Sequence, residues 1–260
     1  MAADPHAPGE GVMLETHGLT IKRGEVEVLR DITVTLKPGA ITAIVGPNGA
    51  GKSSLLMALA GLLEPAAGAV LLEGETLSNL APRERARKIG YLPQNGEIAW
   101  DVASEAVVAL GRMPHGDARQ KPVEAAIAAL DLKTLRHRVA SQLSGGERAR
   151  VLLGRVLAGE PRWILADEPL AALDLAHQIN LIKHLRQCAK DGAGVVIVIH
   201  DLALARNHAD HVITLREGRV LADGKPVEAL SSSIIAEGWD VQTQWLESAG
   251  QHALAALDKG

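Results

Sequence analysis

The chain has 260 residues, of which 47% are hydrophobic and 22% charged, and its formal net charge is −4 at pH 7. This composition predicts a globular protein with a substantial core, and the acidic balance argues against nucleic-acid binding, which usually needs a basic surface. Cys188 is the only cysteine, so no intramolecular disulfide can form and a reducing compartment is expected. No apolar run approaches the roughly 18 residues that a membrane-spanning helix needs, so any channel must come from another chain.

Taken in chain order, the first third of the sequence predicts a tail, strands and one helix. Residues 1–10 are polar and lack the basic start and apolar core of a signal peptide, so we expect a flexible tail there. Residues 12–21 and 27–36 alternate between apolar and polar, as in an antiparallel pair of strands. Residues 40–46 form a continuous apolar strand that runs into a glycine-rich loop, and helical spacing begins at residue 52. Two more short strands are expected at 68–75 and 87–94.

The remainder of the chain predicts an α/β core interrupted by helices. Residues 95–154 are helical and poor in strands, which indicates an inserted helical subdomain. Strands and helices alternate again over 155–228, including a helix at 175–189. These residues together with 11–94 are expected to form one α/β core with a parallel sheet. Residues 229–260 predict a helical C-terminal tail, in which Trp239 and Trp245 anchor packing.

The stretch "GPNGAGKSS" fits the P-loop pattern G-x-x-x-x-G-K-[ST] and stands between an apolar strand and a helix, as that motif requires. Its glycines let the backbone wrap a polyphosphate with N–H groups pointing inward. Lys52 supplies positive charge to the outer phosphates, and Ser53 a hydroxyl ligand for Mg²⁺. The predicted phosphate-binding residues are Gly46, Pro47, Asn48, Gly49, Ala50, Gly51, Lys52, Ser53 and Ser54.

A partner carboxylate should lie at the end of a neighbouring buried strand, and "WILADE" supplies two. Adjacent residues of a strand point to opposite sides, so Asp167 and Glu168 are expected to differ in role. Asp167 can hold the Mg²⁺ shell, while Glu168 faces the γ-phosphate and activates water. On its own, an acidic pair at a strand end would equally be a solvated terminus.

The stretch "SQLSGGERAR" suggests a second anion site. Ser144, Gly145 and Gly146 come immediately before or at the start of a predicted helix, where exposed N–H groups and the helix dipole favour a negative ligand. Ser144 with Glu147 three residues later is equally a good capping box. Both interpretations can hold together.

Six motifs, "GPNGAGKSS", "YLPQ", "LSGGE", "WILADEP", "AALD" and "IVIHD", occur in the order and approximate spacing of one family. Over about residues 12–228 the chain resembles the ATP-binding cassette (ABC) ATPases. The resemblance implies a P-loop NTPase core with an N-terminal antiparallel β subdomain and an inserted α-helical subdomain, and it implies MgATP as the ligand. It also implies a head-to-tail dimer, in which "LSGGE" of one copy covers the ATP held by the P-loop of the other. ATP should close that pair and hydrolysis should open it.

The same resemblance implies roles for four further residues. Gln94 would touch Mg²⁺ or the attacking water and sense a membrane partner, and His200 would contact the γ-phosphate. Asp174 would run along the dimer interface. Arg23 stands where the family usually stacks an aromatic side chain on adenine, a contact that a guanidinium can replace by cation–π stacking. Leu170 and Ala171 stand where Thr and Ser are common, which removes hydroxyls from the loop that spans the dimer.

The helical insertion carries "GRMPH" at residues 111–115, which resembles a run found in ATPases that serve importers of iron–siderophore complexes, haem and cobalamin. This predicts a peripheral protein on the cytoplasmic face of the cell membrane. Its partners would be a second copy, two transmembrane permease subunits and, indirectly, a periplasmic substrate-binding protein. Arg112 is expected to lie in the groove that docks the permease. As an alternative, the segment is an ordinary helix stop and the chain is a soluble ABC ATPase of the iron–sulfur cluster assembly type.

Overall fold

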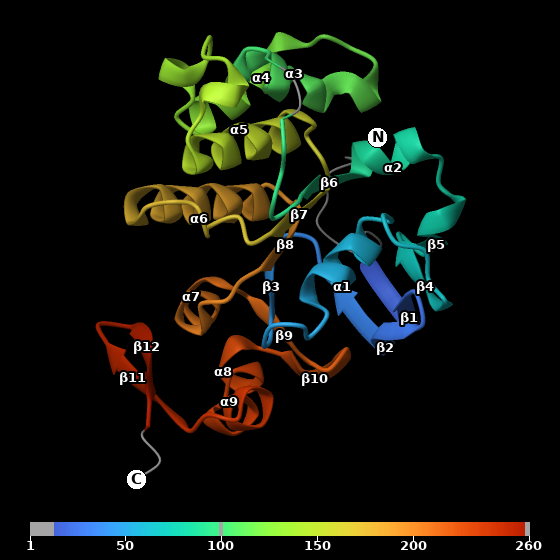
Figure 1. Ribbon diagram of the computed structural model, residues 1–260, viewed down its shortest axis with the longest axis vertical. Coiled ribbons are helices and arrows are strands. Elements are labelled where there is room, and N and C mark those ends of the chain that lie inside the picture. The colour runs from blue at the N-terminus through green and yellow to red at the C-terminus, as the bar shows by residue number, and fades with distance from the viewer. Residues whose placement is uncertain (1–12, 99–100, 258–260) are drawn as a thin grey trace, which may run out of the picture.

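The computed structural model describes residues 13–98 and 101–257, and the tail predicted at residues 1–10 lies outside them. At the centre is a six-stranded sheet of order β10-β9-β3-β8-β7-β6, parallel except for the edge strand β10 (Figure 1). Three strands are buried along their whole length, which accounts for their unbroken apolar sequences. The strands are β3 (Ile41–Val45), β6 (Ile89–Leu92), β7 (Trp163–Asp167), β8 (Gly194–Val198), β9 (His211–Arg216) and β10 (Arg219–Gly224).

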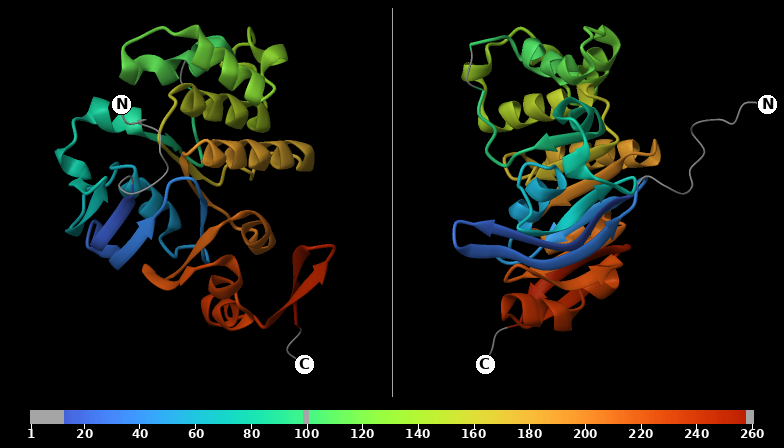
Figure 2. Two further views of the ribbon diagram at one scale, coloured as in Figure 1. Left: turned by 180° about the vertical axis from the view of Figure 1, so that it is seen from behind. Right: turned by 90° about the vertical axis from the view of Figure 1, so that its right-hand side faces the viewer.

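A second, antiparallel sheet of order β2-β1-β4-β5 covers one face of the core, as the side view in Figure 2 shows. In β2 the buried residues Ile32, Val34 and Leu36 alternate with the exposed Thr33 and Thr35, as the period-two pattern predicts. Helix α1 (Lys52–Leu59) contacts strands of both sheets. The strands of this sheet are β1 (Leu14–Arg23), β2 (Val26–Leu36), β4 (Ala67–Leu72) and β5 (Glu75–Thr76), and the short helices η1 (Leu77–Asn79) and α2 (Pro82–Lys88) follow.

The predicted helical subdomain forms the upper part of the molecule in Figure 1. Its central helix, α5, packs on the other helices and continues to Ala158, so the boundary expected at residue 154 falls inside this helix. The helices are α3 (Ser104–Ala109), η2 (Leu110–His115), α4 (Gln120–Ala129), η3 (Lys133–Leu135), η4 (Ala140–Gln142) and α5 (Gly145–Ala158).

The second face of the central sheet packs against helices that follow β7 in the chain. Ile164 and Ala166 of β7 join the apolar cluster beneath these helices, whereas Trp163 and Leu165 join the cluster around α1. The sheet therefore separates two cores. The covering helices are α6 (Leu175–Lys190), α7 (Leu202–His208), α8 (Pro226–Ala229) and α9 (Ser232–Trp239).

The end of the chain differs from the helical tail predicted over 229–260. After α9, a hairpin forms from β11 (Thr243–Ser248) and β12 (Gln251–Ala256). The two turn residues, Ala249 and Gly250, have positive φ angles of 51° and 72°, which suits a tight two-residue turn.

Trp245 holds this hairpin against the core, and it is the anchor that the sequence predicted. Its indole Nε1 donates a hydrogen bond to the carbonyl of Leu230 at 2.7 Å, and the Arg206 guanidinium lies 4.4 Å from the ring centroid. The helical prediction is wrong for residues 243–256, because these tertiary contacts outweigh the helix preference of the Ala and Leu residues there.

Candidate active site

The P-loop connects β3 to α1, and two of its glycines leave no room for a side chain. Gly46 has a φ of 150°, and a Cβ there would lie 2.3 Å from the carbonyl oxygen of Leu215. Gly51 has a φ of 99°, and its Cβ would lie 2.8 Å from the carbonyl oxygen of Val28. A Cβ on Gly49, by contrast, would meet nothing within 4 Å. The loop is thus packed on its inner side and open on its outer side, where a polyphosphate could approach the backbone.

Lys52 begins α1 and turns its ammonium group back onto this loop. Its Nζ donates hydrogen bonds to the carbonyls of Gly46 and Pro47, each at 2.9 Å. Burial lowers the pKa of Lys52, and the charges of Glu168 and Asp167 oppose that shift. The charge stands at the rim of the open loop, where it can pair with phosphate oxygens.

Asp167 closes β7 and is 4% exposed. Burial raises its pKa, while a hydrogen bond with the Ser53 hydroxyl opposes the shift. Its Oδ1 is buried without a hydrogen-bond partner among the described residues. An unpartnered carboxylate oxygen beside a hydroxyl is a donor set that suits Mg²⁺, so the residues present fit this ion.

Glu168 and His200 meet at the ends of neighbouring parallel strands, where ligands of open α/β sheets bind. Glu168 Oε1 lies 2.5 Å from His200 Nε2. Glu168 adopts the left-handed region with a φ of 49°, a costly conformation for a non-glycine residue that points to a functional constraint. Its side chain is 13% exposed, so the carboxylate is sheltered yet reachable.

Gln94 and Arg23 lie at the margins of this group. Gln94 follows β6, whose Leu92 pairs with Ala166, so the glutamine stands at the same sheet edge as Asp167 and is exposed. Arg23 ends β1, and its Nη2 lies 3.6 Å from the Sδ of Met57 on α1.

The predicted capping box at the start of α5 is present. Ser144 Oγ accepts a hydrogen bond from the backbone N–H of Glu147 at 3.3 Å, and Glu147 Oε2 accepts one from the Ser144 N–H at 2.8 Å. A Cβ on Gly145 would meet nothing within 4 Å, whereas one on Gly146 would lie 2.7 Å from the Ala172 carbonyl. The "LSGGE" segment therefore has one open side, at Gly145, and one side, at Gly146, packed on the loop before α6.

Asp174 caps α6 from that loop. Its Oδ1 accepts hydrogen bonds from the N–H of His177 at 2.9 Å and from His177 Nδ1 at 2.8 Å, and these bonds lower the pKa of Asp174. Sequence reasoning missed His177, although an aspartate N-cap followed three residues later by a polar side chain is a readable signal.

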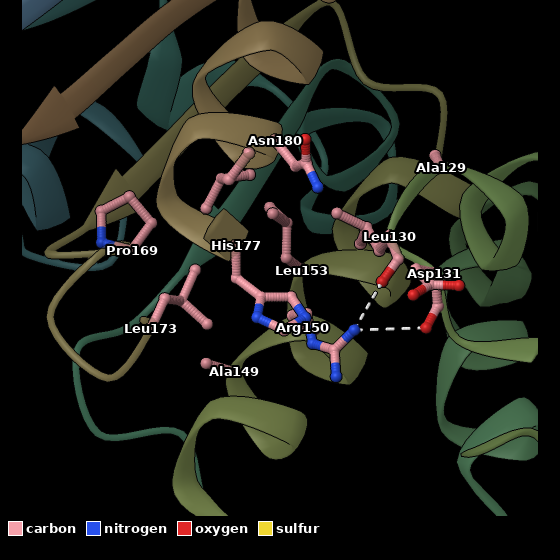
Figure 3. Close-up of a pocket in the computed structure, with 11 residues that line it drawn as sticks. Ala129, Leu130, Asp131, Ala149, Arg150, Leu153, Pro169, Leu173, His177 and Asn180 are labelled. Carbon is pink, nitrogen blue, oxygen red and sulfur yellow. Dashed lines mark hydrogen bonds between the residues drawn. The ribbon is translucent and has the colours of Figure 1, made fainter. Parts of the chain in front are cut away.

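His177 also lines a small cleft between α5 and α6 (Figure 3). Across the cleft, Arg150 Nη1 donates hydrogen bonds to the carbonyls of Leu130 at 3.1 Å and Asp131 at 3.2 Å. The cleft marks the joint between the helical subdomain and the core.

The "GRMPH" segment is a structural junction. Arg112 is 2% exposed and its guanidinium bonds Asp117 at 2.7 and 2.9 Å, Glu160 at 2.9 Å and the Ala158 carbonyl at 3.1 Å. A Cβ on Gly111 would lie 2.1 Å from the carbonyl oxygen of Arg155, so η2 packs directly on α5. The expectation that Arg112 faces a docking groove is wrong, because its charge is used inside the subdomain. Sequence reasoning also missed both partners of Arg112. Glu160 could not be found from a local pattern, because it lies 48 residues from Arg112 in the chain, whereas Asp117 is five residues away.

Within residues 13–98 and 101–257, no helix has the length and apolar character needed to cross a membrane.

Comparisons with known proteins show the family to which this fold belongs. Residues 29–171 match the family model described as ABC transporter. The chain is 46% identical over 231 residues to a hemin import ATP-binding protein of Pseudomonas entomophila, an alignment that covers 86% of this chain and 91% of the relative. It is 40% identical over 259 residues to a hemin import ATP-binding protein of Myxococcus xanthus, covering 95% and 97%.

Two solved structures are similar over most of the fold. One is an ATP-binding cassette in a dimeric post-hydrolysis state with ADP and Pi, with 29% identity and a TM-score of 0.75 over 82% of this chain and 98% of that one. The other belongs to an inward-facing transporter assigned to the metal-chelate type, with 25% identity and a TM-score of 0.79 over 96% and 99%. A family match across more than half of the chain, and relatives that agree along nearly all of it, place this protein among the ATPases of the ABC transporter family.

Proposed function

We propose that the chain is the ATP-hydrolysing subunit of a bacterial importer for hemin, and that it works with separate permease subunits. The observation that carries this proposal is the identity of 40–46% to hemin import ATP-binding proteins along most of the chain. The solved transporter of the metal-chelate type supports the same substrate class. The relatives named above do not favour the iron–sulfur cluster assembly alternative.

The P-loop residues 46–54 bind the phosphates of ATP, and Arg23 stacks on the adenine. Ser53, Asp167 and Gln94 would hold Mg²⁺, which would supply positive charge to offset that of the phosphates. The unpartnered Oδ1 of Asp167 supports this assignment.

Glu168 accepts a proton from the attacking water, and His200 orients the Glu168 carboxylate through their shared hydrogen bond. Lys52 stabilises negative charge as it develops on the transferred phosphoryl group. His200 is about half exposed, so its ring can also reach toward the γ-phosphate, the contact that the family resemblance implies.

Two copies pair head to tail. Ser144, Gly145 and Gly146 of one copy meet the γ-phosphate bound by the other, and Asp174 lies along the interface. The open side of Gly145 and the exposure of Asp174 support this arrangement. ATP closes the pair and hydrolysis opens it, which drives the permease.

The dimer binds the cytoplasmic side of the cell membrane through two permease subunits, which receive hemin from a periplasmic binding protein. The groove between Gln94 and about His115 docks a short helix of each permease subunit. With Arg112 buried, the side chain that η2 offers to such a helix is Met113, which is 67% exposed.

Growth of a deletion strain of the source bacterium tests this proposal. We expect the strain to fail with hemin as its sole iron source and to grow normally with ferrous salts. Wild-type chain and the exposed control Glu237→Gln restore growth, and Glu168→Gln does not. A strain that still uses hemin, but loses growth on an iron–siderophore complex or on a cobalamin-dependent medium, would overturn the hemin assignment.

A further inference from the structure

A cavity of about 240 Å³ lies away from the P-loop's open side, where the two large sheets meet. β2 is an edge strand of the antiparallel sheet and β10 is an edge strand of the central sheet. The cavity has the volume of about eight water molecules, which suits a small ligand. Its lining residues are Arg30, Arg216, Glu217, Arg219, Val220 and Leu221.

Three arginines gather here on a protein whose formal charge is −4. Their acidic neighbours are only loosely engaged: Glu27 lies 4.0 Å from Arg30, and Glu217 and Asp240 lie 3.7 and 3.4 Å from Arg216. These distances exceed those of well-formed charge-assisted bonds, and exposed pairs of this kind contribute little.

Arg219 is exposed, and its side chain forms no hydrogen bond or ion pair with any residue of the described segments. The guanidinium donors of the cavity are therefore largely available to a ligand. Planar guanidinium forks match phosphate oxygens well, and several of them around one cavity select a phosphate-bearing anion.

The turn between β9 and β10 connects this cavity to the P-loop. The N–H of Gly218 donates to the carbonyl of Ala50 at 3.1 Å, and the N–H of Arg30 donates to the carbonyl of Gly218 at 2.8 Å. Gly218 has a φ of 75°, and a Cβ there would lie 2.7 Å from the Val28 carbonyl oxygen. The turn that carries two of the arginines is thus bonded directly to a P-loop residue.

We propose that this cavity is a binding site for a phosphate-bearing anion, and that its occupancy alters the nucleotide affinity of the P-loop through Gly218 and Ala50. The anion is a small phosphorylated molecule or a phospholipid headgroup. Because coupling of two sites is reciprocal, a bound nucleotide changes the affinity for the anion by the same factor. The proposal is independent of which substrate the importer carries.

Calorimetric titration with inorganic phosphate tests the site. The full chain is first saturated with Mg²⁺ and a non-hydrolysable ATP analogue, so that the P-loop cannot take up the probe. Wild-type protein should bind phosphate saturably, and Arg219→Gln should bind at least about tenfold more weakly. Arg162→Gln is the matched control, since Arg162 is an exposed arginine that precedes β7 far from the cavity along the fold.

A second arm distinguishes the two sources of phosphate. Co-sedimentation with phosphatidylglycerol vesicles, compared with phosphatidylcholine vesicles, should depend on Arg219 only if the ligand is a headgroup. Either phosphate or vesicle binding that falls in Arg219→Gln and persists in Arg162→Gln supports the site. Absence of saturable binding in both arms, or equal binding by the two variants, would overturn it. Nucleotide affinity that is the same with and without bound phosphate would overturn the coupling.

Discussion

At the residue scale, the proposed chemistry depends on a few side chains that the fold holds in unusual states. Glu168 has a left-handed backbone and bonds His200, Asp167 keeps an unpartnered buried oxygen, and Lys52 is buried against its own loop. Each of these states lowers the stability of the fold, and the packing of the surrounding strands and loop must compensate for that loss. Residues in such states cluster at active sites, where charged groups are held in position before the substrate binds.

Glu168→Gln should separate binding from catalysis. The amide keeps the shape and the contact with His200 but cannot accept a proton, so kcat should fall by ~10²–10⁴-fold while ATP affinity is retained. Steady-state hydrolysis and equilibrium nucleotide binding measure the two effects. Glu237→Gln, an exposed change on α9, should alter neither. Hydrolysis by Glu168→Gln at the wild-type rate would show that another group takes the proton.

At the scale of elements, ion pairs across the helical subdomain fix η2 to α5. The Arg112 guanidinium beside Asp117 holds the pKa of that carboxyl well below its ordinary value of 3.8. Because the folded-state pKa is depressed, its contribution to stability is complete above the ordinary value, declines as pH falls below that value, and is gone once pH has fallen through the lowered folded-state pKa. The pair therefore stabilises the subdomain at neutral pH and not in strong acid.

The free energy of unfolding should consequently depend on pH through Asp117. Between about pH 5 and about pH 2, wild-type protein should lose more stability than Asp117→Asn, and the gap between the two should narrow as pH falls. Urea unfolding at each pH provides the measurement. Glu75→Gln, which changes an exposed carboxylate, should run parallel to wild type. Parallel curves for wild type and Asp117→Asn would show that the ion pair does not set this pH dependence.

Elements whose signals are local could be predicted from the sequence, and those fixed by distant contacts could not. The apolar runs of β3, β7 and β8, the P-loop and the capping box at Ser144 are each encoded within a few residues. The C-terminal hairpin depends on the contacts of Trp245 with Leu230 and Arg206. Its turn sequence is Ala-Gly, which is a weaker hairpin signal than Asn-Gly. The burial of Arg112 likewise depends on Glu160, far away in the chain.

Trp245→Ala should release that hairpin without unfolding the core. The side chain is partly buried, so the local cost should be about 2 kcal/mol, roughly half that of a core tryptophan. Hydrogen exchange of residues 243–256 should accelerate, while β3 and β7 remain protected. Leu246→Ala is the control, since Leu246 is the next residue in the same strand and its side chain is 52% exposed. Unchanged exchange in Trp245→Ala would mean that other contacts hold the hairpin.

At the scale of the whole molecule, the two elements proposed to bind phosphate lie in different parts of the fold. The P-loop precedes α1 in the core, whereas Ser144 starts α5 in the helical subdomain, and the views of Figure 2 place them in separate parts of the fold. No hydrogen bond or ion pair within residues 13–98 and 101–257 joins one to the other. In the proposed arrangement, one chain therefore presents two half-sites, and a complete site requires a second copy.

Mixing two inactive variants tests this arrangement. Lys52→Ala removes the P-loop cation, and Gly145→Asp puts a negative charge where the proposed dimer places the γ-phosphate bound by the other copy. The aspartate enters open space at a helix N-terminus, which favours an acidic side chain, so the fold should survive.

A head-to-tail heterodimer has one intact site, so an equal mixture should regain up to about a quarter of wild-type hydrolysis if the sites act independently. Co-purification through an affinity tag on one variant, in the presence of ATP, checks that heterodimers form. If they form and the mixture stays as inactive as each variant alone, either the half-sites are not exchanged between copies or one intact site cannot turn over. A heterodimer of wild type with the Lys52→Ala, Gly145→Asp double variant, in which a head-to-tail pair leaves no intact site, then separates these two explanations.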